Sequence, residues 1–367
     1  MAQTIIPWGA PQAQKKWSAT LAVDVNRKGY WSRKFIGKGQ NSVIEEKLEV
    51  ASDAGDRVSF DLSVQLRQRP TFGDKRVKGK EEALRFFSDE VAIDQMRHPV
   101  SAGGRMSRKR TIHDMRKIAK DRLADYWKQY LDEMMFIYLS GARGVNPEFI
   151  EPTDYTGFAN NALQAPDASH ILYAGAAKAK AEITSSDKMN RSLIERASTA
   201  AKMMRTRDTE AASMVPVDVD GEPHFVVVMS TFQEYDLRNS TTANDWMDIQ
   251  KAVATAEGRN NPIFKGGLGM INNVVLHSHE NVIRFSDYGA GANLPAARAL
   301  FLGRQAGVIA YGTPGGMRFM WKEEMEDYDN EPTVVAGVIL GFKKTRFNGR
   351  DFGVMALDTY AKDPEAA

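Results

Sequence analysis

The chain has 367 residues and a net charge of +2, from 49 basic and 47 acidic side chains, and 43% of its residues are hydrophobic. This is the composition of a globular protein with material for two or three domains, and its overall charge is too small to indicate a nucleic-acid binder. The absence of cysteine excludes disulfides and thiol catalysis. Because it has neither a signal-peptide pattern nor an apolar run long enough to cross a bilayer, we expect a soluble cytosolic protein.

The first 42 residues are basic and aromatic. They hold seven basic residues against one acidic residue, and the basic set includes Lys15, Lys16, Arg27 and Lys28. Aromatic residues are spaced irregularly among them: Trp8, Trp17, Tyr30, Trp31 and Phe35. The charge alone leaves contact with a polyanion and a solvated tail equally open. The aromatic content predicts that this arm lies over another surface, of its own chain or of a neighbour.

A long β excursion is predicted over residues 47–100. Between Val58 and Leu66, apolar residues alternate strictly with polar ones, which is the pattern of a strand with one apolar face. Residues 69–74 break this strand, residues 75–80 are predicted to form an exposed basic tip, and a return segment follows. A lone hairpin has no second layer of its own. We therefore expect something else to cover its apolar face, and a second copy of the chain is the candidate.

A long helix is predicted over residues 107–140, and the rest of the chain is organised around it. Its apolar residues recur at steps of three, four or five: Ile112, Met115, Ile118, Leu123, Tyr126, Tyr130, Met134 and Ile137. Residues 111–114 resemble a capping box and give an alternative start, while Gly141 ends the helix. Residues 134–139 are apolar on all sides and should be buried. A flat surface should cover the apolar stripe of the first half.

The remaining chain mixes helices and strands. Helices are predicted over residues 171–183, 185–204 and 244–257. A strand is predicted over residues 225–230, one or two strands over 273–285, and a partly helical segment over 295–310. Two strand-like runs, 333–347 and 350–360, flank Asn348-Gly349, which is the strongest short signal for a β-hairpin. The overall prediction is an α+β fold.

Two groups of residues have some of the features of a metal site. His277 and His279 would lie on one face of a strand, but no third ligand accompanies them. Residues 218–222 lack the spacing of a calcium loop and are predicted to form a hairpin turn. We therefore expect no metal-binding residues.

Catalytic motifs are also missing. Gly-rich segments at 37–39, 265–269 and 312–316 lack the residues of a phosphate-binding loop and are predicted to be turns. The acidic run at 323–331 offers no selected carboxylate pair, and it is predicted to be a solvated loop or to dock on a basic surface of a neighbour. We expect no catalytic or cofactor-binding residues, and a protein that is not an enzyme.

Five stretches of the chain are similar to blocks of a known family. They are GKEEAL at 79–84, VAIDQMR at 91–97, YLSGARG at 138–144, ALFLGRQA at 299–306 and GFKKTRF at 341–347. In this order they resemble the coat proteins of podophages like coliphage N-four. The succession of basic arm, outward β excursion, spine helix and closing α+β region resembles a tailed-phage major capsid protein of the Hong Kong ninety-seven fold.

The resemblance implies a shell subunit. Its parts would be an N-terminal arm, an extended β loop that overlaps an adjacent subunit, a peripheral domain with the spine helix at 107–140, an axial domain, and a C-terminal β-hairpin that returns to the peripheral domain. The corresponding ranges are 1–43, 44–103, 104–215, 216–330 and 331–367. Some relatives crosslink subunits through a lysine and an asparagine, and those positions have no match here.

The implied partners are those of a virion. The subunits would form hexamers and pentamers of an icosahedral shell around double-stranded DNA, assembled in the host cytoplasm. A portal protein and a cement or scaffolding protein would be further partners, and no membrane contact is implied.

Two other functions remain open. An encapsulin-like nanocompartment shell has the same fold with a protein cargo, and it has no need of a basic arm. A hydrolase using His277, His279 and the acidic run would be a small oligomer with bound metal. The nucleic-acid content of purified particles, their size and elemental analysis separate the three.

Overall fold

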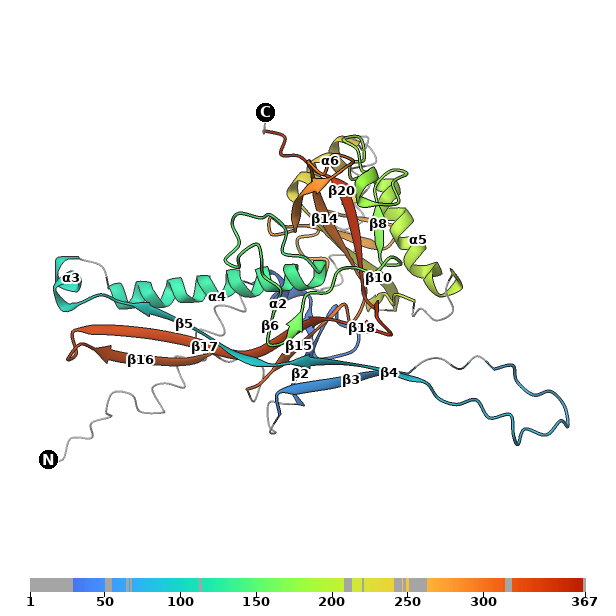
Figure 1. Cartoon of the computed structure of the whole chain (residues 1–367), viewed down its shortest axis with the longest axis horizontal. Coiled ribbons are helices and arrows are strands. Elements are labelled where there is room, and N and C mark those ends of the chain that lie inside the picture. The colour runs from blue at the N-terminus through green and yellow to red at the C-terminus, as the bar shows by residue number, and fades with distance from the viewer. Residues whose placement is uncertain are drawn as a thin grey trace.

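The computed structural model describes most of the chain. The described residues are 29–49, 55–63, 66, 68–111, 114–207, 213–219, 221–240, 246, 249–250, 263–313 and 319–365. Most of the predicted arm and of the helix predicted at 244–257 lies outside these residues. Figure 1 shows an elongated molecule with a compact body and two long projections that point in opposite directions.

A six-stranded sheet forms the elongated half of the molecule (Figure 1). In spatial order its strands are β1 (Ile36–Gly37), β2 (Ile44–Lys47), β15 (Gly307–Tyr311), β17 (Glu331–Lys344) and β16 (Met320–Glu326), with β5 (Asp94–Ser101) also paired to β17. Alternate residues of β17 are fully buried, because side chains in a strand alternate between the two faces. These residues belong to the core shared with α4 (Met115–Ser140): Val334, Ala336, Val338 and Leu340.

The long helix α4 begins at Met115, which is later than both predicted starts. A start at residue 107 is wrong, because residues 107–110 belong to a separate short helix, α3 (Arg105–Arg110). The Asp114 carboxylate caps α4 by accepting the backbone N–H groups of Arg116 and Lys117 at 3.1 and 3.2 Å. Gly141 ends the helix in the left-handed conformation, with φ +69°.

The burial of α4 follows the prediction except in its first turns. All residues from 134 to 139 are buried, as expected. Met115 and Ile118 in the first turns are exposed, although the spacing had placed them on the covered stripe. Leu123 is buried as predicted, and Ala119, which the stripe did not include, is buried before it, so only the first turn of the helix departs from the predicted stripe.

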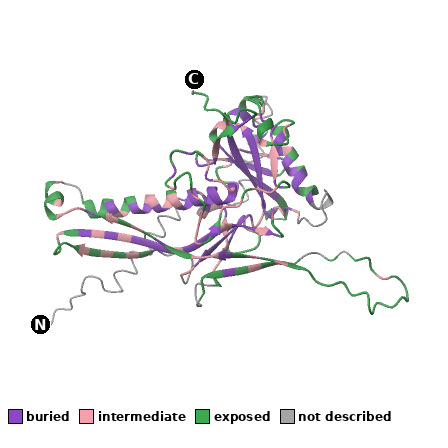
Figure 2. Ribbon diagram, viewed as in Figure 1, coloured by how far each residue is buried: buried purple, intermediate pink, exposed green. Residues whose placement is uncertain are grey.

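A second sheet of eight strands forms the other half of the body. Its central order is β11 (Gly269–Ile271), β12 (Val274–Ser278), β10 (Glu222–Met229), β14 (Leu294–Leu302), β20 (Val354–Tyr360) and β8 (Ile171–Tyr173). Two further strands, β9 (Val217–Val219) and β13 (Arg284–Tyr288), pair with β10 and β14. On β10, Val226 and Val228 face the core that includes α4, whereas Val227 faces the core that includes α5 (Arg191–Arg207). Both faces of this sheet are therefore covered (Figure 2).

Several predicted elements differ from the structure. Residues 295–310, predicted to be partly helical, form β14 and β15. Residues 171–183 form β8 and a 3-10 turn, η2 (Lys180–Glu182), in place of a helix. The helix predicted from 185 begins at Arg191, where the Asn190 side chain accepts the N–H of Leu193 at 2.9 Å. Residues 273–285 enter two strands, β12 and β13, and the strand at 225–230 is confirmed as β10. The helix α6 (Thr231–Ser240) follows β10 directly.

The predicted C-terminal hairpin is a tight turn between strands that separate. Asn348 and Gly349 have φ of +52° and +71°, as a two-residue hairpin turn requires. Only β18 (Arg346–Phe347) and β19 (Arg350–Asp351) pair across it. Beyond them β17 remains in the six-stranded sheet and β20 enters the eight-stranded one, so a long hairpin over 331–367 is wrong.

Candidate functional site

The β excursion is the first candidate assembly surface. Its strands β3 (Arg57–Ser63) and β4 (Phe86–Ala92) are antiparallel, with Val58 opposite Val91. Both side chains are buried against Val308 and Ala310 of β15. The chain therefore covers the base of the excursion itself, and the expectation that the whole apolar face needs another molecule is wrong at this end.

The outer part of the excursion is uncovered. Figure 1 shows residues 68–85 as a long open loop that extends away from the body, and Figure 2 shows it as exposed. Large apolar side chains that are 54–64% exposed lie along it: Leu66, Phe72, Val77, Leu84 and Phe86. Such a group of exposed apolar residues is characteristic of a surface that binds another protein.

Polar contacts fix the direction in which the excursion leaves the body. The Asn161 side chain binds the backbone of Ala92 on both sides, accepting its N–H at 3.0 Å and donating to its carbonyl at 2.8 Å. Asn161 lies in a short hairpin of β6 (Gly157–Phe158) and β7 (Asn161–Ala162). Nearby, the Asp89 carboxylate binds the Lys343 ammonium and accepts the N–H of Arg346 at 3.1 Å. The base of the excursion is thus held by β7 and by the end of β17.

A second candidate surface is the place where the N-terminal arm joins the body. The helix α2 (Tyr30–Lys34) lies against α4, and the Asp132 carboxylate accepts the N–H groups of Tyr30 and Trp31 at 2.9 and 3.3 Å. Trp31 and Phe35 are buried in the main core. Residues 30–43, assigned to the arm from the sequence, are therefore partly built into the body.

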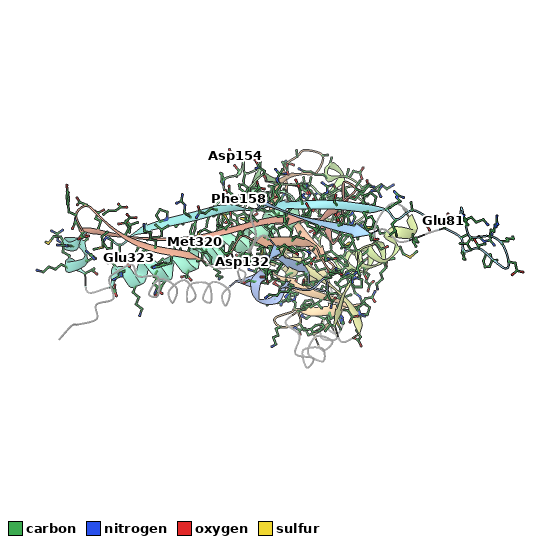
Figure 3. The ribbon with its side chains drawn as sticks, turned by 90° about the horizontal axis from the view of Figure 1, so that it is seen from below. Glu81, Asp132, Asp154, Phe158, Met320 and Glu323 are labelled. Carbon is green, nitrogen blue, oxygen red and sulfur yellow. The ribbon has the colours of Figure 1, made fainter. Side chains whose placement is uncertain are left out.

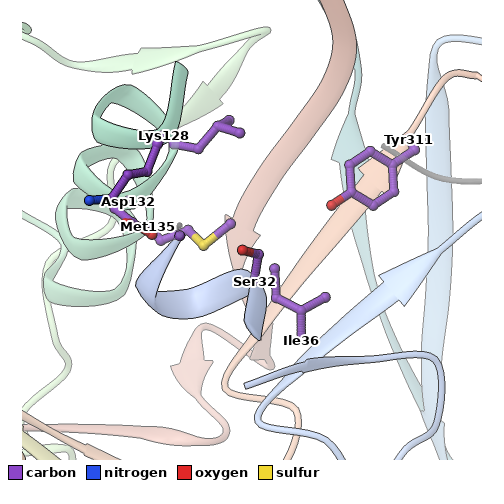
Figure 4. Close-up of a pocket in the computed structure, with 8 residues that line it drawn as sticks. Ser32, Ile36, Lys128, Asp132, Met135 and Tyr311 are labelled. Atoms are coloured by element: carbon purple, nitrogen blue, oxygen red, sulfur yellow. The ribbon is translucent and has the colours of Figure 1, made fainter. Parts of the chain in front are cut away.

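Asp132 carries a buried charge at this junction. Burial raises the pKa of Asp132 to about 6, although the two N–H groups that it accepts oppose the shift. A small cavity beside it is shown in Figure 4, and the side chains labelled around it are Ser32, Ile36, Lys128, Asp132, Met135 and Tyr311. The carboxylate serves as the N-terminal cap that α2 does not supply from its own sequence.

Of the two histidines that were candidate metal ligands, His277 is buried in the core and His279 is half-buried beside it. They do lie on one side of the strand, because both rings contact the ring of Tyr30. The Nε2 atom of His277 lies 2.8 Å from the carbonyl of Ile263, and His279 packs against Phe136. Burial lowers the pKa of each imidazole to about 4. Among the described residues no three His, Asp or Glu side chains are placed to hold a metal ion.

The acidic run at 323–331 is a hairpin, so the prediction of a solvated loop there is wrong. Residues 320–326 form β16, residues 327–329 turn in the left-handed region, and β17 follows. Glu323 pairs with Arg116 of α4. In Figure 3, Glu323 lies toward one end of the molecule and Glu81 of the excursion toward the other. The hairpin turn predicted at 218–222 is confirmed by the pairing of β9 with β10.

The burial of α2 and of Asp132 was not predicted from the sequence. The Tyr30, Trp31 and Phe35 group has helical spacing, and this signal identifies α2 as a buried segment. Asp132 is a charged residue at the edge of the apolar half of α4, and such a residue commonly has a buried partner. No described helix is both long and apolar enough to cross a membrane.

A model of the phage capsid protein family matches residues 5–363. The chain belongs to the phage capsid protein family. It is 63% identical to the protein in the capsid of Ralstonia phage GP4, with a TM-score of 0.89 and 100% of both chains covered. It is also 27% identical over 348 residues to the major capsid protein of Pseudomonas phage KPP25, with 88% of each covered.

More distant capsid proteins share the fold of this chain at low sequence identity. The cyanophage Pam1 capsid subunit is 21% identical with a TM-score of 0.68, and 90% of this chain and 93% of that chain are covered. The predicted fold, α+β of the Hong Kong ninety-seven type, is confirmed. As a phage capsid protein the chain is a structural component of a virion shell built from many copies. The more specific likeness to N-four-like coat proteins stays a prediction.

Proposed function

We propose that the protein is the major capsid subunit of a tailed phage and assembles into an icosahedral shell of hexamers and pentamers around double-stranded DNA. The observation that carries this proposal is the outer excursion, whose large apolar side chains no described residue covers. Full burial of one such side chain contributes about 1.5–3 kcal/mol. Repeated at every subunit, this contact favours many copies over one.

The extended β loop would lie on an adjacent subunit. Its tip, residues 68–85, carries six basic and three acidic side chains, so it suits a surface with acidic groups. The hydrogen bonds and the ion pair of Asn161 and Asp89 at its base hold the loop in one orientation. A preorganised loop loses less conformational entropy on binding than a mobile one does.

We assign the domains by sheet and not by continuous range. The peripheral domain would comprise the six-stranded sheet with α4, and the axial domain the eight-stranded sheet with α5 and α6. This moves β15 and β16 out of the axial range 216–330, and it moves β8, α5 and β20 into the axial domain. The arm proper would end before α2.

The arm would contact the packaged DNA. Its residues Lys15, Lys16, Arg27 and Lys28 precede α2, and the cap at Asp132 fixes the place where the arm leaves the body. Assembly would take place in the host cytoplasm, with a portal protein and a cement or scaffolding protein as partners. An encapsulin-like shell is disfavoured by the high identity to a phage capsid chain.

Expression of the chain in bacteria tests the proposal. We expect megadalton particles that electron microscopy shows as closed shells. Deletion of residues 1–28 should leave the subunit folded while lowering the nucleic-acid content of particles. A protein that stays monomeric, and particles that carry a protein cargo without nucleic acid, would each contradict the proposal.

A further inference from the structure

The helix α4 connects the two halves of the molecule. Figure 1 shows it running from the outer end of the elongated half into the body, where the eight-stranded sheet begins. Along its length α4 packs on β17 and β5 of the six-stranded sheet, and its C-terminal end reaches β14 of the eight-stranded sheet. The direction of α4 relative to β14 therefore sets how the two halves of the subunit are oriented.

The C-terminal end of α4 has no positive charge of its own. The last four carbonyl groups of a helix have no partner within it, and a cation beside them is favourable. The last turn of α4 contains no basic residue. The Ser140 carbonyl instead accepts a hydrogen bond from Nη1 of Arg298, a residue of β14, at 3.0 Å. The eight-stranded sheet thus supplies the cation at the end of α4.

Arg298 is itself held in place by the strands on either side of it. Its Nε and Nη2 atoms lie 2.7 and 2.8 Å from the two carboxylate oxygens of Asp358 in β20. The hydroxyl of Tyr288 in β13 donates to the same carboxylate at 2.6 Å, and the guanidinium lies over the ring of Phe285 at 4.9 Å. Arg298, Asp358 and Tyr288 are 8%, 0% and 1% exposed. The direction in which Nη1 points toward the helix is therefore fixed.

The stability of the fold does not by itself account for this buried pair. Burial disfavours a charged guanidinium, but the Asp358 carboxylate outweighs that effect and raises the pKa of Arg298, so the pair stays charged. A buried ion pair contributes little net stability compared with apolar side chains of similar volume. What arginine adds is geometry, because one edge of its planar guanidinium binds the carboxylate and Nη1 remains for the helix.

A second set of contacts holds the loop that follows the helix. Asn146 donates to the carbonyl of Val282 at 3.1 Å and accepts the N–H of Arg284 at 2.8 Å. These contacts lie beyond Gly141, the left-handed residue at which the chain leaves the helical direction. They fix the loop on β13, whereas the contact at Ser140 acts on the helix itself.

We propose that Arg298 is a positioning residue for assembly: by holding the end of α4 on β14 and β20, it fixes the angle between the two halves of the subunit and so the curvature at which subunits meet. Identical subunits close into shells of one size only when each presents its contact surfaces at a defined angle. The excursion packs on β15 of the six-stranded sheet, so its direction relative to the eight-stranded sheet depends on this contact. The inference rests on the proposed function.

Hydrogen exchange of unassembled subunits tests the contact in two variants. Y288F/R298M/D358L replaces the polar group with apolar side chains of similar volume, so the subunit should fold. R298K keeps a charge beside Asp358 but lacks the fork that binds the carboxylate and Ser140 together. In both variants the amides of residues 138–141 should exchange about tenfold faster or more, because the helix end loses a charged hydrogen-bond donor, while α5 stays the same.

Electron microscopy of the assembled variants tests the consequence for the shell. The wild type should form shells of one diameter, whereas both Arg298 variants should give several diameters or incomplete shells. K188M/D236L is the control, because it removes another ion pair of the eight-stranded half, at 2.8 Å, that does not involve α4. The control should match the wild type in the exchange of α4 and in shell diameter.

The two measurements separate this inference from the proposed function. If the wild type forms no shell, the proposed function fails, and the exchange of residues 138–141 still decides whether Arg298 holds the helix. Unchanged exchange in the folded variants would overturn the contact. Faster exchange with shells of one diameter would overturn its role in curvature. If the triple variant does not fold, R298K carries both measurements.

Discussion

Asp132 joins the arm to the spine helix through a carboxylate buried between them. Its pKa is raised to about 6, whereas the ordinary value is 3.8, so the folded protein takes up this proton first as the pH falls. The contribution of Asp132 to stability therefore grows as the pH falls from 6 toward 4, and it is lost as the pH rises through the same window.

Asp132→Asn removes this titration while keeping an oxygen that can accept the N–H groups of α2. Relative to the wild type, the unfolding free energy of the variant should rise by about 2–3 kcal/mol between pH 4 and pH 7, because a shift of two pKa units corresponds to about that energy. Denaturant unfolding of unassembled subunits at several pH values measures this difference. Parallel pH profiles for the two proteins would show that the carboxylate is not buried in this way.

His279 titrates in the opposite sense. Burial lowers its pKa to about 4, so the unfolded chain binds the proton near pH 6.5 and stability is lost as the pH falls from 6.5 to 4. His279→Phe keeps the ring contacts with Tyr30 and Phe136 and loses a hydrogen bond from the N–H of Asn281. We expect a less steep loss of stability on acidification. His98→Phe, which alters a histidine stacked on Tyr126 away from this cluster, is the control.

At the scale of elements, the two hydrogen bonds between the Asn161 side chain and the Ala92 backbone allow a prediction about the excursion. Asn161→Ala removes two hydrogen bonds to the backbone of Ala92 and leaves that N–H and carbonyl without their partner. The expected local cost is about 1–3 kcal/mol. Hydrogen exchange of the amides of β4 should become faster while that of α5 stays the same. Unchanged protection of β4 would mean that these hydrogen bonds do not hold the excursion.

Elements with a strong local signal could be predicted from the sequence. Gly141 and the turn at Asn348-Gly349 were found because each needs a left-handed backbone. The sequence of β14 predicts a partly helical segment because both faces of the strand are buried, so its apolar residues do not alternate with polar ones. The separation of β17 from β20 has no local signal either, since it depends on distant partners, β15 and β14.

The candidate surfaces were predictable to different degrees. The alternation of apolar and polar residues that begins at Val58 predicts the excursion. It does not predict that Val308 covers the base of the excursion, because that contact joins distant parts of the chain. The left-handed turn at Tyr328 is imposed by the pairing of β16 with β17. Asp327 and Asp329 tolerate a left-handed backbone but are equally common in solvated loops, so the sequence predicts only an acidic loop there.

At the scale of the whole molecule, substitutions in the outer excursion should prevent assembly and leave the folding of the subunit unchanged. Phe72→Ser with Leu84→Ser replaces side chains that are already exposed in the single chain, so the melting temperature of unassembled subunits should change little. Shell formation should fail, because the apolar area that the neighbour buries is lost. Met203→Ser, at an exposed apolar residue of α5, is the matched control. A double variant that forms normal shells would exclude the loop from the interface.

The central claim is that the outer excursion finds its cover on another copy of the chain. Electron microscopy of the purified full-length protein, at a resolution that traces the chain, tests this most directly. The account predicts closed shells in which residues 68–85 of each subunit lie on the body of an adjacent one. A monomer with these residues folded back onto its own body would contradict it.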